Sequence, residues 1–227
     1  NECLQQIFSS ATPEGSIHNM LSYLGTTFSC DRAYIFEQQD EFVVKNTYEW
    51  CAENVSPQKA VLQSVPLSAI DWWMPPFEKN EVIVIDQLEE IRAKHPEAYA
   101  ILKPQDITSL AAGPIKVDGQ VIGFLGVDNP DEQMMSLVTP LLNVIGYFTT
   151  TLLKRRDLLR RLHELSYYDQ MTGALNRNAL VERYGTLNAQ SIGVLNCDIT
   201  GLKRINDAQG HEAGDRLICR CYNLIRD

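Results

Sequence analysis

The chain has 227 residues, of which 44% are hydrophobic and 22% are charged, and its formal net charge is −9. These values are ordinary for a globular protein of one or two domains. The charge is uneven, because residues 1–132 hold 8 basic and 20 acidic side chains whereas residues 133–227 hold 12 and 9. The acidic first part argues against nucleic acid or an anionic membrane as its partner.

No unbroken apolar run approaches the roughly 18–20 residues that span a bilayer, so we expect no contact with a membrane. The six cysteines are scattered, without a CxxC pair and without histidines at zinc-ligand spacing. That pattern indicates reduced thiols and a cytoplasmic protein.

The first elements in chain order are a helix and a hairpin. Residues 16–29 carry apolar side chains at helical spacing. Residues 33–37 and 42–48 are predicted as two strands joined by the polar turn 38–41. Residues 50–80 contain four prolines, which exclude a long regular element there.

A second hairpin closes this part of the chain. Residues 82–85 form a short β-branched run, and residues 87–103 have a helical pattern in which Pro96 opens a second helix. Strands at 110–117 and 120–127 then flank Asp118-Gly119, which is the strongest hairpin signal in the sequence. Antiparallel strands with helices outside them indicate an α+β fold.

This order of elements, together with the passage GPIKVDGQVIGFLGVDNP at residues 113–130, resembles a GAF domain. The resemblance covers roughly residues 14–150. It implies an antiparallel sheet with flanking helices, in which the variable middle of the chain closes a pocket for a small molecule.

Aromatic side chains are concentrated where such a pocket is expected. Each of them could equally be an ordinary core residue. The sequence shows no haem or zinc spacing and no cyclic-nucleotide pattern, so the ligand stays unidentified. The candidate sensor-pocket residues are Tyr48, Trp50, Trp72, Trp73 and Phe77.

A long helix follows the second hairpin. It carries an apolar seam with alternating spacings of three and four residues, which is typical of a coiled coil. Its first turns are expected to pack on their own domain, and its later, basic turns to pair with a second copy in a parallel homodimer. The seam comprises Val138, Leu141, Ile145, Phe148, Leu152, Arg155, Leu159, Leu162 and Ser166.

The residues best suited to bind a metal ion or a nucleotide are concentrated at 198–217, which read DITGLKRINDAQGHEAGDRL. A buried strand is predicted at 191–197, so that Asp198 lies at its end and Gly201 opens a helix. A carboxylate in that place can bind a divalent cation, and free amides at a helix start can bind a phosphate.

The same run resembles the front half of a GGDEF (diguanylate cyclase) domain, without a gap. An earlier passage, Asp169 to Arg177 (DQMTGALNR), resembles the opening of that family. The predicted organisation is therefore a GAF-like sensory domain at 1–132, a signalling and dimerisation helix at 133–166 and the N-terminal fragment of a GGDEF domain at 167–227.

The resemblance implies roles for individual residues. Asp198 would bind Mg²⁺. The backbone around Thr200–Lys203, which includes Leu202, would approach the β- and γ-phosphates of GTP, and Asn206 and Asp215 would read guanine. A carboxylate can accept hydrogen bonds from guanine N1–H and N2–H together, which adenine does not offer. Alternatively, Asp215 only stabilises a helix N-terminus, and Asn206 only belongs to a turn.

The sequence departs from the family pattern in two ways. Thr200 stands where the family has a second acid, and the GG(D/E)EF motif is absent from these residues, so the chain holds no catalytic residue of that family. We expect a signal-transduction protein whose GGDEF domain, in complete form, converts two GTP into cyclic di-GMP, whereas the chain as given is inactive. The alternative is a non-catalytic, dimeric ligand-binding module with a truncated or degenerate GGDEF part.

Overall fold

The computed structural model describes residues 10–186 and 193–226. The chain divides into two compact units, Asn1–Arg156 and Asp157–Asp227. Each unit is described here by itself.

The first unit is built on one antiparallel sheet with the strand order β3-β2-β1-β6-β5-β4. This confirms the predicted α+β fold and both predicted hairpins. At the tip of the second hairpin, Asp118 and Gly119 have φ angles of 51° and 86°, the left-handed values that a two-residue hairpin turn requires. The strands are β1 (Arg32–Gln38), β2 (Val43–Cys51), β3 (Val65–Pro66), β4 (Ile83–Ile85), β5 (Leu110–Val117) and β6 (Gln120–Asp128).

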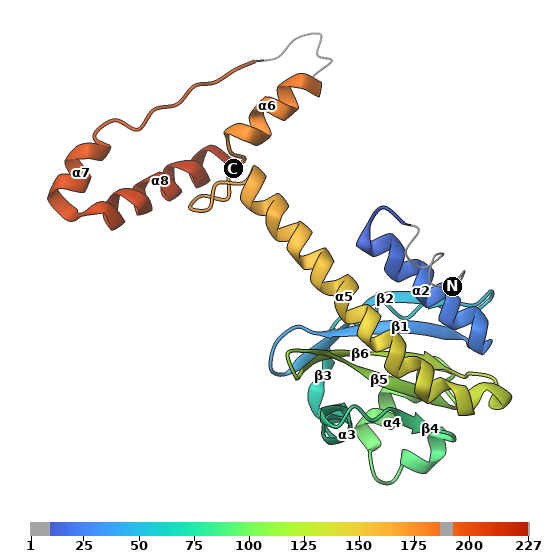
Figure 1. Ribbon diagram of the computed structural model, residues 1–227. Coiled ribbons are helices and arrows are strands. Elements are labelled where there is room, and N and C mark those ends of the chain that lie inside the picture. Colours follow the sequence, from blue (N-terminus) through green and yellow to red (C-terminus); the bar gives the residue numbers. More distant parts are fainter. Residues whose placement is uncertain (1–9, 187–192, 227) are drawn as a thin grey trace. The chain divides into compact units, whose positions relative to one another are not determined.

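Helices cover both faces of the sheet (Figure 1). On one face, α2 (Pro13–Phe28) and the first part of α5 (Met135–Tyr167) enclose what we call the first cluster of buried apolar side chains. On the other face, α3 (Met74–Glu78) and α4 (Pro96–Leu102) enclose the second cluster. Short 3₁₀ turns connect these elements: η1 (Leu67–Trp73), η2 (Leu88–Ile91), η3 (Lys103–Gln105) and η4 (Glu132–Met134).

Residues at both ends of helix α2 cap it. Thr12 precedes it in an extended conformation, and its Oγ1 accepts a hydrogen bond from the Gly15 amide at 3.2 Å. Pro13 occupies the first turn, where its missing N–H costs nothing. The helix ends at Ser29, whose φ of 47° is left-handed. Its apolar stripe is buried in the first cluster and comprises Ile17, Met20, Leu21, Leu24 and Phe28.

Helix α5 is continuous, as predicted, and only part of it is buried. Seven of its side chains and Gly146 are buried, and the last of these is Arg156. No later residue of the helix, all of which the structure describes, is buried. The seven side chains belong to Val138, Leu142, Ile145, Thr149, Leu152, Leu153 and Arg156.

One helical stretch among the described residues, Glu132–Tyr167, is long and apolar enough to cross a membrane by length and composition alone. This stretch contains no unbroken apolar run of that length, because an average over a window can reach the threshold where polar residues interrupt the apolar ones. Several apolar side chains of this stretch, including Val138, Leu142 and Ile145, lie in the first cluster.

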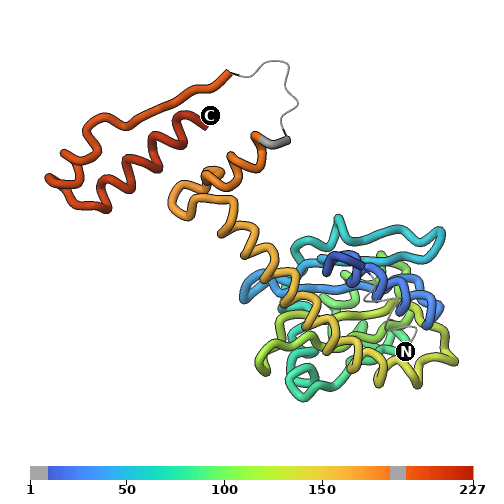
Figure 2. The backbone as a smooth tube through the Cα atoms, turned by 45° about the horizontal axis from the view of Figure 1, so that its top comes forward, coloured from blue at the N-terminus to red at the C-terminus, as the bar shows by residue number. Residues whose placement is uncertain are grey.

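The second unit contains α6 (Arg177–Thr186), α7 (Leu202–Gln209) and α8 (His211–Arg226). Figure 2 shows the chain from residue 193 running into the α7–α8 pair. The strand predicted at 191–197 is not formed: residues 193–197 are irregular, and residues 191 and 192 lie outside the described part. The reason is physical, since a strand needs a neighbour for its backbone hydrogen bonds and the described residues of this unit provide only an isolated bridge, Tyr168 with Leu175.

Candidate functional site

A cavity lies in the first unit between the sheet and the short elements that cover it. Its volume is about 40 Å³. Apolar side chains form most of the wall, and polar side chains are gathered among them. The lining residues are Arg32, Tyr34, Phe36, Asn46, Glu49, Leu62, Val65, Ile70, Trp73, Ala98, Ile101, Leu102, Gln105, Ile107, Phe124 and Asp128.

Three of the five predicted pocket residues belong to the second cluster. Trp73 is buried and lines the cavity. Phe77 is buried beside it, with the two ring centroids 5.9 Å apart, but does not line the cavity. Trp72 points elsewhere, because its ring stacks on His95 at a centroid distance of 4.0 Å.

The other two predicted residues, Tyr48 and Trp50, pack against the first cluster on the opposite face of the sheet. The Trp50 ring lies against Gly25 of α2, where any side chain at Gly25 would collide with it. The set predicted from sequence is therefore divided between the two faces, because aromatic composition alone does not say which way a strand residue points.

An irregularity in β2 decides which residues face the cavity. Ile35 pairs with Tyr48, whereas the next residue, Phe36, pairs with Asn46, so Thr47 is an extra residue in the ladder. A bulge of this kind reverses the alternation of side chains. Asn46 consequently lines the cavity, although simple alternation would place it on the face of Tyr48.

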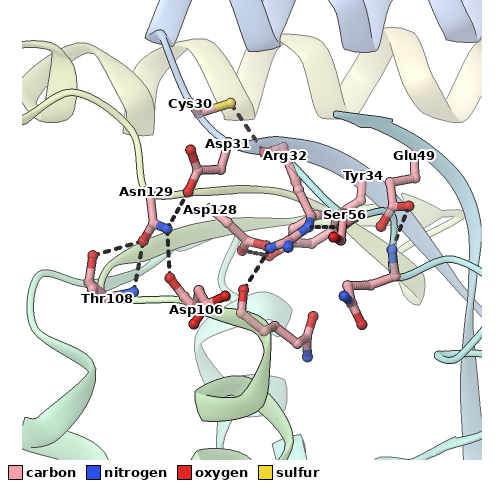
Figure 3. A network of polar contacts seen from close by, with 12 residues as sticks. Cys30, Asp31, Arg32, Tyr34, Glu49, Ser56, Asp106, Thr108, Asp128 and Asn129 are labelled. Atoms are coloured by element: carbon pink, nitrogen blue, oxygen red, sulfur yellow. Dashed lines mark hydrogen bonds and ion pairs between the residues drawn. The ribbon is translucent and has the colours of Figure 1, made fainter. Parts of the chain in front are cut away.

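The charged end of the cavity is centred on Arg32 (Figure 3). Its guanidinium donates to the carbonyl oxygens of Ser56 at 3.1 Å and Gln105 at 3.0 Å, and lies 3.6 Å from Asp128 Oδ2. Tyr34 donates from its hydroxyl to Asp128 Oδ1 at 2.9 Å. Burial raises the pKa of Asp128 to about 7, against the opposing effects of Tyr34 and Arg32.

Asn129, which follows Asp128 in the sequence, links the surrounding loops by hydrogen bonds. Asn129 accepts at Oδ1 from the amide and hydroxyl of Thr108, at 2.7 and 2.9 Å, and from the amide of Ser109 at 3.1 Å. Its Nδ2 donates to Asp31 Oδ2 at 2.6 Å and to the carbonyl of Asp106 at 3.0 Å. The sequence analysis did not predict this network. The feature that could have indicated it is the polar pair Asp128-Asn129 at the end of an otherwise apolar strand.

Two polar atoms of cavity-lining residues have no hydrogen-bond partner within the described part of the chain. They are Asn46 Oδ1 and Trp73 Nε1. The other amide atom of Asn46 donates to Glu49 Oε1 at 3.1 Å, and Glu49 Oε2 accepts from the amides of Gln58 and Lys59 at 2.9 and 3.0 Å. An unpaired buried polar atom costs about 1–3 kcal/mol, so these two atoms are suited to meet a ligand.

On the opposite face, a buried ion pair fixes α5 where it leaves the first cluster. The two Nη atoms of Arg156 donate to the two Oε atoms of Glu37, each at 2.7 Å. The guanidinium also lies 5.7 Å from the ring centroid of Tyr48. Burial alone would raise the pKa of Glu37, but hydrogen bonds from Arg156 and Thr47 and the charge of Arg156 lower it overall. Tyr48 therefore supports the helix rather than the cavity.

In the second unit, the motif residues lie on the α7–α8 pair and the segment before it. Gly201 opens α7 with a φ of 85°, and Gly210 separates the two helices with a φ of 83°. Asn206 packs directly against Gly214, leaving no room for a side chain at that glycine. Gly214 directly precedes Asp215 in the sequence, so Asn206 contacts the residue next to Asp215.

The remaining predicted residues are less enclosed. Asp198, Lys203 and Asp215 are exposed, and Leu202 is half-buried. In the described ranges no group of three or more histidine, cysteine or acidic side chains could hold a metal ion. Because Thr200 stands at the second acidic position, Asp198 is the one predicted acidic ligand here. A Mg²⁺ site would need a further acid, which in the GGDEF family comes from the motif that these residues lack.

The passage from residue 169 to 177 forms a turn held by its own side chains. Asp169 Oδ1 accepts from the amide and the hydroxyl of Thr172 at 2.8 and 2.7 Å. Asn176 then caps α6 by accepting from the amides of Asn178 and Ala179, and its Nδ2 donates to the carbonyl of Ser166 at 2.8 Å. These contacts agree with a structural role for the turn.

Comparisons with known proteins match both parts of the chain. Residues 12–147 match the family model described as GAF domain, and residues 166–227 match the one described as diguanylate cyclase, GGDEF domain. The chain is 30% identical over 182 residues to the methanogenesis regulatory histidine kinase FilI of Methanothrix harundinacea, covering 74% of this chain and 20% of that protein. It is 35% identical over 76 residues to the cyclic di-GMP phosphodiesterase NbdA of Pseudomonas aeruginosa, covering 29% and 10%.

Solved structures support the fold of the first unit. The PixJ GAF domain of Thermosynechococcus elongatus aligns with a TM-score of 0.52 at 14% identity, over 70% of this chain and 96% of that one. The chromophore-binding domain of the bacteriophytochrome RpBphP3 of R. palustris aligns with a TM-score of 0.57 at 11% identity, over 70% and 61%. The present chain spans a fifth of FilI and a tenth of NbdA. It belongs to the GAF domain family, and its residues 166–227 are part of a GGDEF domain.

Proposed function

We propose that this signalling protein couples a ligand-sensing GAF domain to a GGDEF domain that, in complete form, converts two GTP into cyclic di-GMP. The observation that carries the proposal is the gap-free GGDEF run at residues 198–217 on the α7–α8 pair, where Asn206 and Gly214 pack together next to Asp215. Asn206 Oδ1 is buried and lacks a partner among the described residues, so it is an acceptor suited to a base N–H.

The test uses the protein expressed from the whole reading frame, whatever its length. With GTP and Mg²⁺ this protein should form cyclic di-GMP. Asp215→Ala should reduce use of GTP about ten- to hundredfold by leaving guanine donors unpaired, whereas Asp198→Asn should abolish turnover and leave the preference for guanine in residual binding. If Asp215→Ala retains full discrimination against ATP, the guanine-reading role is wrong.

The 227 residues by themselves should form no cyclic di-GMP, because they contain neither the GG(D/E)EF motif nor a second acid beside Asp198. The alternative function is a non-catalytic regulatory module, and Thr200 at the second acidic position is the observation that favours it. If the protein expressed from the whole reading frame binds GTP but forms no cyclic di-GMP, that alternative is established.

We also propose that two copies pair in parallel through α5, along a seam that differs from the one predicted by periodicity. Val138, Ile145 and Leu152 of the predicted seam are only 0%, 3% and 2% exposed, because the first cluster uses them. A seam that begins one residue earlier, which we call the outward seam, has the same alternating spacing, and all its members are exposed or half-buried. It comprises Leu137, Leu141, Val144, Phe148, Thr151, Arg155, Leu158, Leu162 and Leu165.

Exposure supports this outward seam. Leu158 is 61% exposed and Leu137 and Val144 are each 53% exposed, although all three are apolar. Seven apolar positions out of nine, spaced as in a coiled coil, are what a second identical helix would cover. Thr151 and Arg155 are the two polar exceptions, and polar positions within such a seam favour one register over others.

Light scattering on two matched variants tests this seam. Leu158→Glu should shift the chain towards monomer by at least tenfold in dissociation constant, whereas Leu159→Glu should have a smaller effect. If Leu159→Glu dissociates the dimer and Leu158→Glu does not, the seam predicted by periodicity is right. An unmodified chain that is monomeric at every concentration contradicts pairing altogether.

A further inference from the structure

We infer that the cavity of the first unit binds a compact, uncharged organic molecule that accepts a hydrogen bond from Trp73 Nε1 and donates one to Asn46 Oδ1. This inference rests on the proposed sensory function and specifies the ligand class that the sensor recognises. Three features of the cavity carry it: the pairing of its charges, its unpaired polar atoms and its size.

The charged groups in the cavity wall already have partners. Arg32 donates to two backbone carbonyls and lies beside Asp128, which also accepts from Tyr34. Glu49 accepts from two backbone amides and from Asn46. One cation and two carboxyl groups line the space, so an anionic ligand finds no unused cation. A cationic ligand would have to compete with amides and Arg32 for the carboxylates.

The unpaired atoms define what the ligand must offer. Asn46 and Trp73 are only 1% and 2% exposed, and both line the cavity. With no partner for Asn46 Oδ1 or Trp73 Nε1 in the described ranges, the empty cavity leaves one acceptor and one donor unsatisfied. A molecule with both an N–H or O–H group and a carbonyl or hydroxyl oxygen would satisfy them, and would gain more affinity than an apolar molecule of the same shape.

Size restricts the ligand further. Pockets for drug-sized molecules measure about 300–1,000 Å³, and a cavity of roughly 150 Å³ accommodates benzene. At about 40 Å³, this space is far below both values and holds a few waters or a molecule of only a few non-hydrogen atoms. Short elements form the wall opposite the sheet, through Ile70 of η1 and through Ala98, Ile101 and Leu102 of α4. A small amide is therefore the appropriate scale.

Acetamide and acetate provide a matched pair of probes, because they share shape and differ in charge and in donor groups. Binding to the 227-residue chain is measured by titration calorimetry at millimolar probe concentrations. Acetamide should bind at least tenfold more tightly than acetate. Cyclase activity is not part of this readout, so a failure here and a failure of the proposed enzymatic function are separate results.

The neighbouring tryptophans provide matched variants. Both Nε1 atoms are buried and unpaired among the described residues, but only Trp73 lines the cavity. Trp73→Phe should weaken acetamide binding about three- to tenfold, which is the loss of one neutral hydrogen bond, and Trp72→Phe should leave it unchanged. Equal effects of the two variants, acetate binding as tightly as acetamide, or no acetamide binding would each overturn the inference.

Discussion

The two units use their apolar side chains in opposite ways. In the first unit, apolar residues from nearly every element meet in two buried clusters on the faces of one sheet. After Arg156, the only buried residues that the structure describes are Ala179, Ala213 and Gly214. Val194 and Leu195, in the segment predicted as a buried strand, are 75% and 82% exposed.

The polar contacts show the same contrast. Arg32 and Gln105 are 73 positions apart in the sequence, and Tyr34 and Asp128 are 94 apart. In the second unit, Asp169 and Thr172 bond across three residues, as helix caps and turns do. A sequence motif can therefore hold its local shape without a core, whereas the sensor cavity exists only because distant segments meet.

The largest expected effect concerns the long-range network. Asp128→Ala leaves the buried Arg32 guanidinium without its carboxylate and Tyr34 without its acceptor, so the free energy of unfolding should fall by about 3–5 kcal/mol. Chemical denaturation measures this. Asp86→Ala, at an exposed carboxylate, should change it by less than about 0.5 kcal/mol. Similar small losses in both variants would mean that the network does not stabilise the sensor.

A second test compares two leucines of α5. Leu152→Ala removes a side chain that is 2% exposed in the first cluster, and it should cost about 2–5 kcal/mol. Leu158→Ala, at a site 61% exposed, should leave the stability of the monomer unchanged within about 0.5 kcal/mol. Thermal unfolding at low protein concentration separates this from any effect on pairing. Equal losses would contradict the assignment of Leu152 to the core.

The ion pair beneath α5 tests a smaller difference. Glu37→Gln weakens a partly buried, two-fold contact with Arg156 and should cost about 1–3 kcal/mol. Glu164→Gln disturbs only an exposed pair with Arg161, at 3.5 Å, for which about 0–1 kcal/mol is expected. Hydrogen exchange of the α5 amides near residue 156 should increase in the first variant only. No such increase would argue that the pair does not fix the helix.

The last test concerns pH, where the expected effect is spread over about three pH units. Because burial raises the pKa of Asp128 to about 7 in the folded chain, while an unfolded aspartate titrates near about pH 4, the folded state binds an extra proton between these values. The free energy of unfolding should therefore fall as pH rises from about 4 to 7, by at most about 1.4 kcal/mol per pH unit from this residue. Asp128→Asn should remove that part of the slope, and an unchanged slope would contradict it.

The sequence by itself determined much of the sensor fold. Alternating apolar residues, the Asp118-Gly119 turn and the capped helix α2 are local signals, because strand and helix periods and left-handed turns depend on near neighbours. The GGDEF run was equally readable, since its residues follow one another without a gap and its Gly201 and Gly210 occupy left-handed positions that favour glycine.

Only the tertiary structure decided which side chains form the cavity and which form the outward seam. The bulge at Thr47 moves Asn46 to the cavity face, away from Tyr48 and Trp50. Burial of Leu152 in the first cluster leaves the neighbouring stripe of α5 exposed. Both outcomes depend on contacts between segments that are distant in the chain, and a periodic pattern cannot specify which of two adjacent faces those segments will cover.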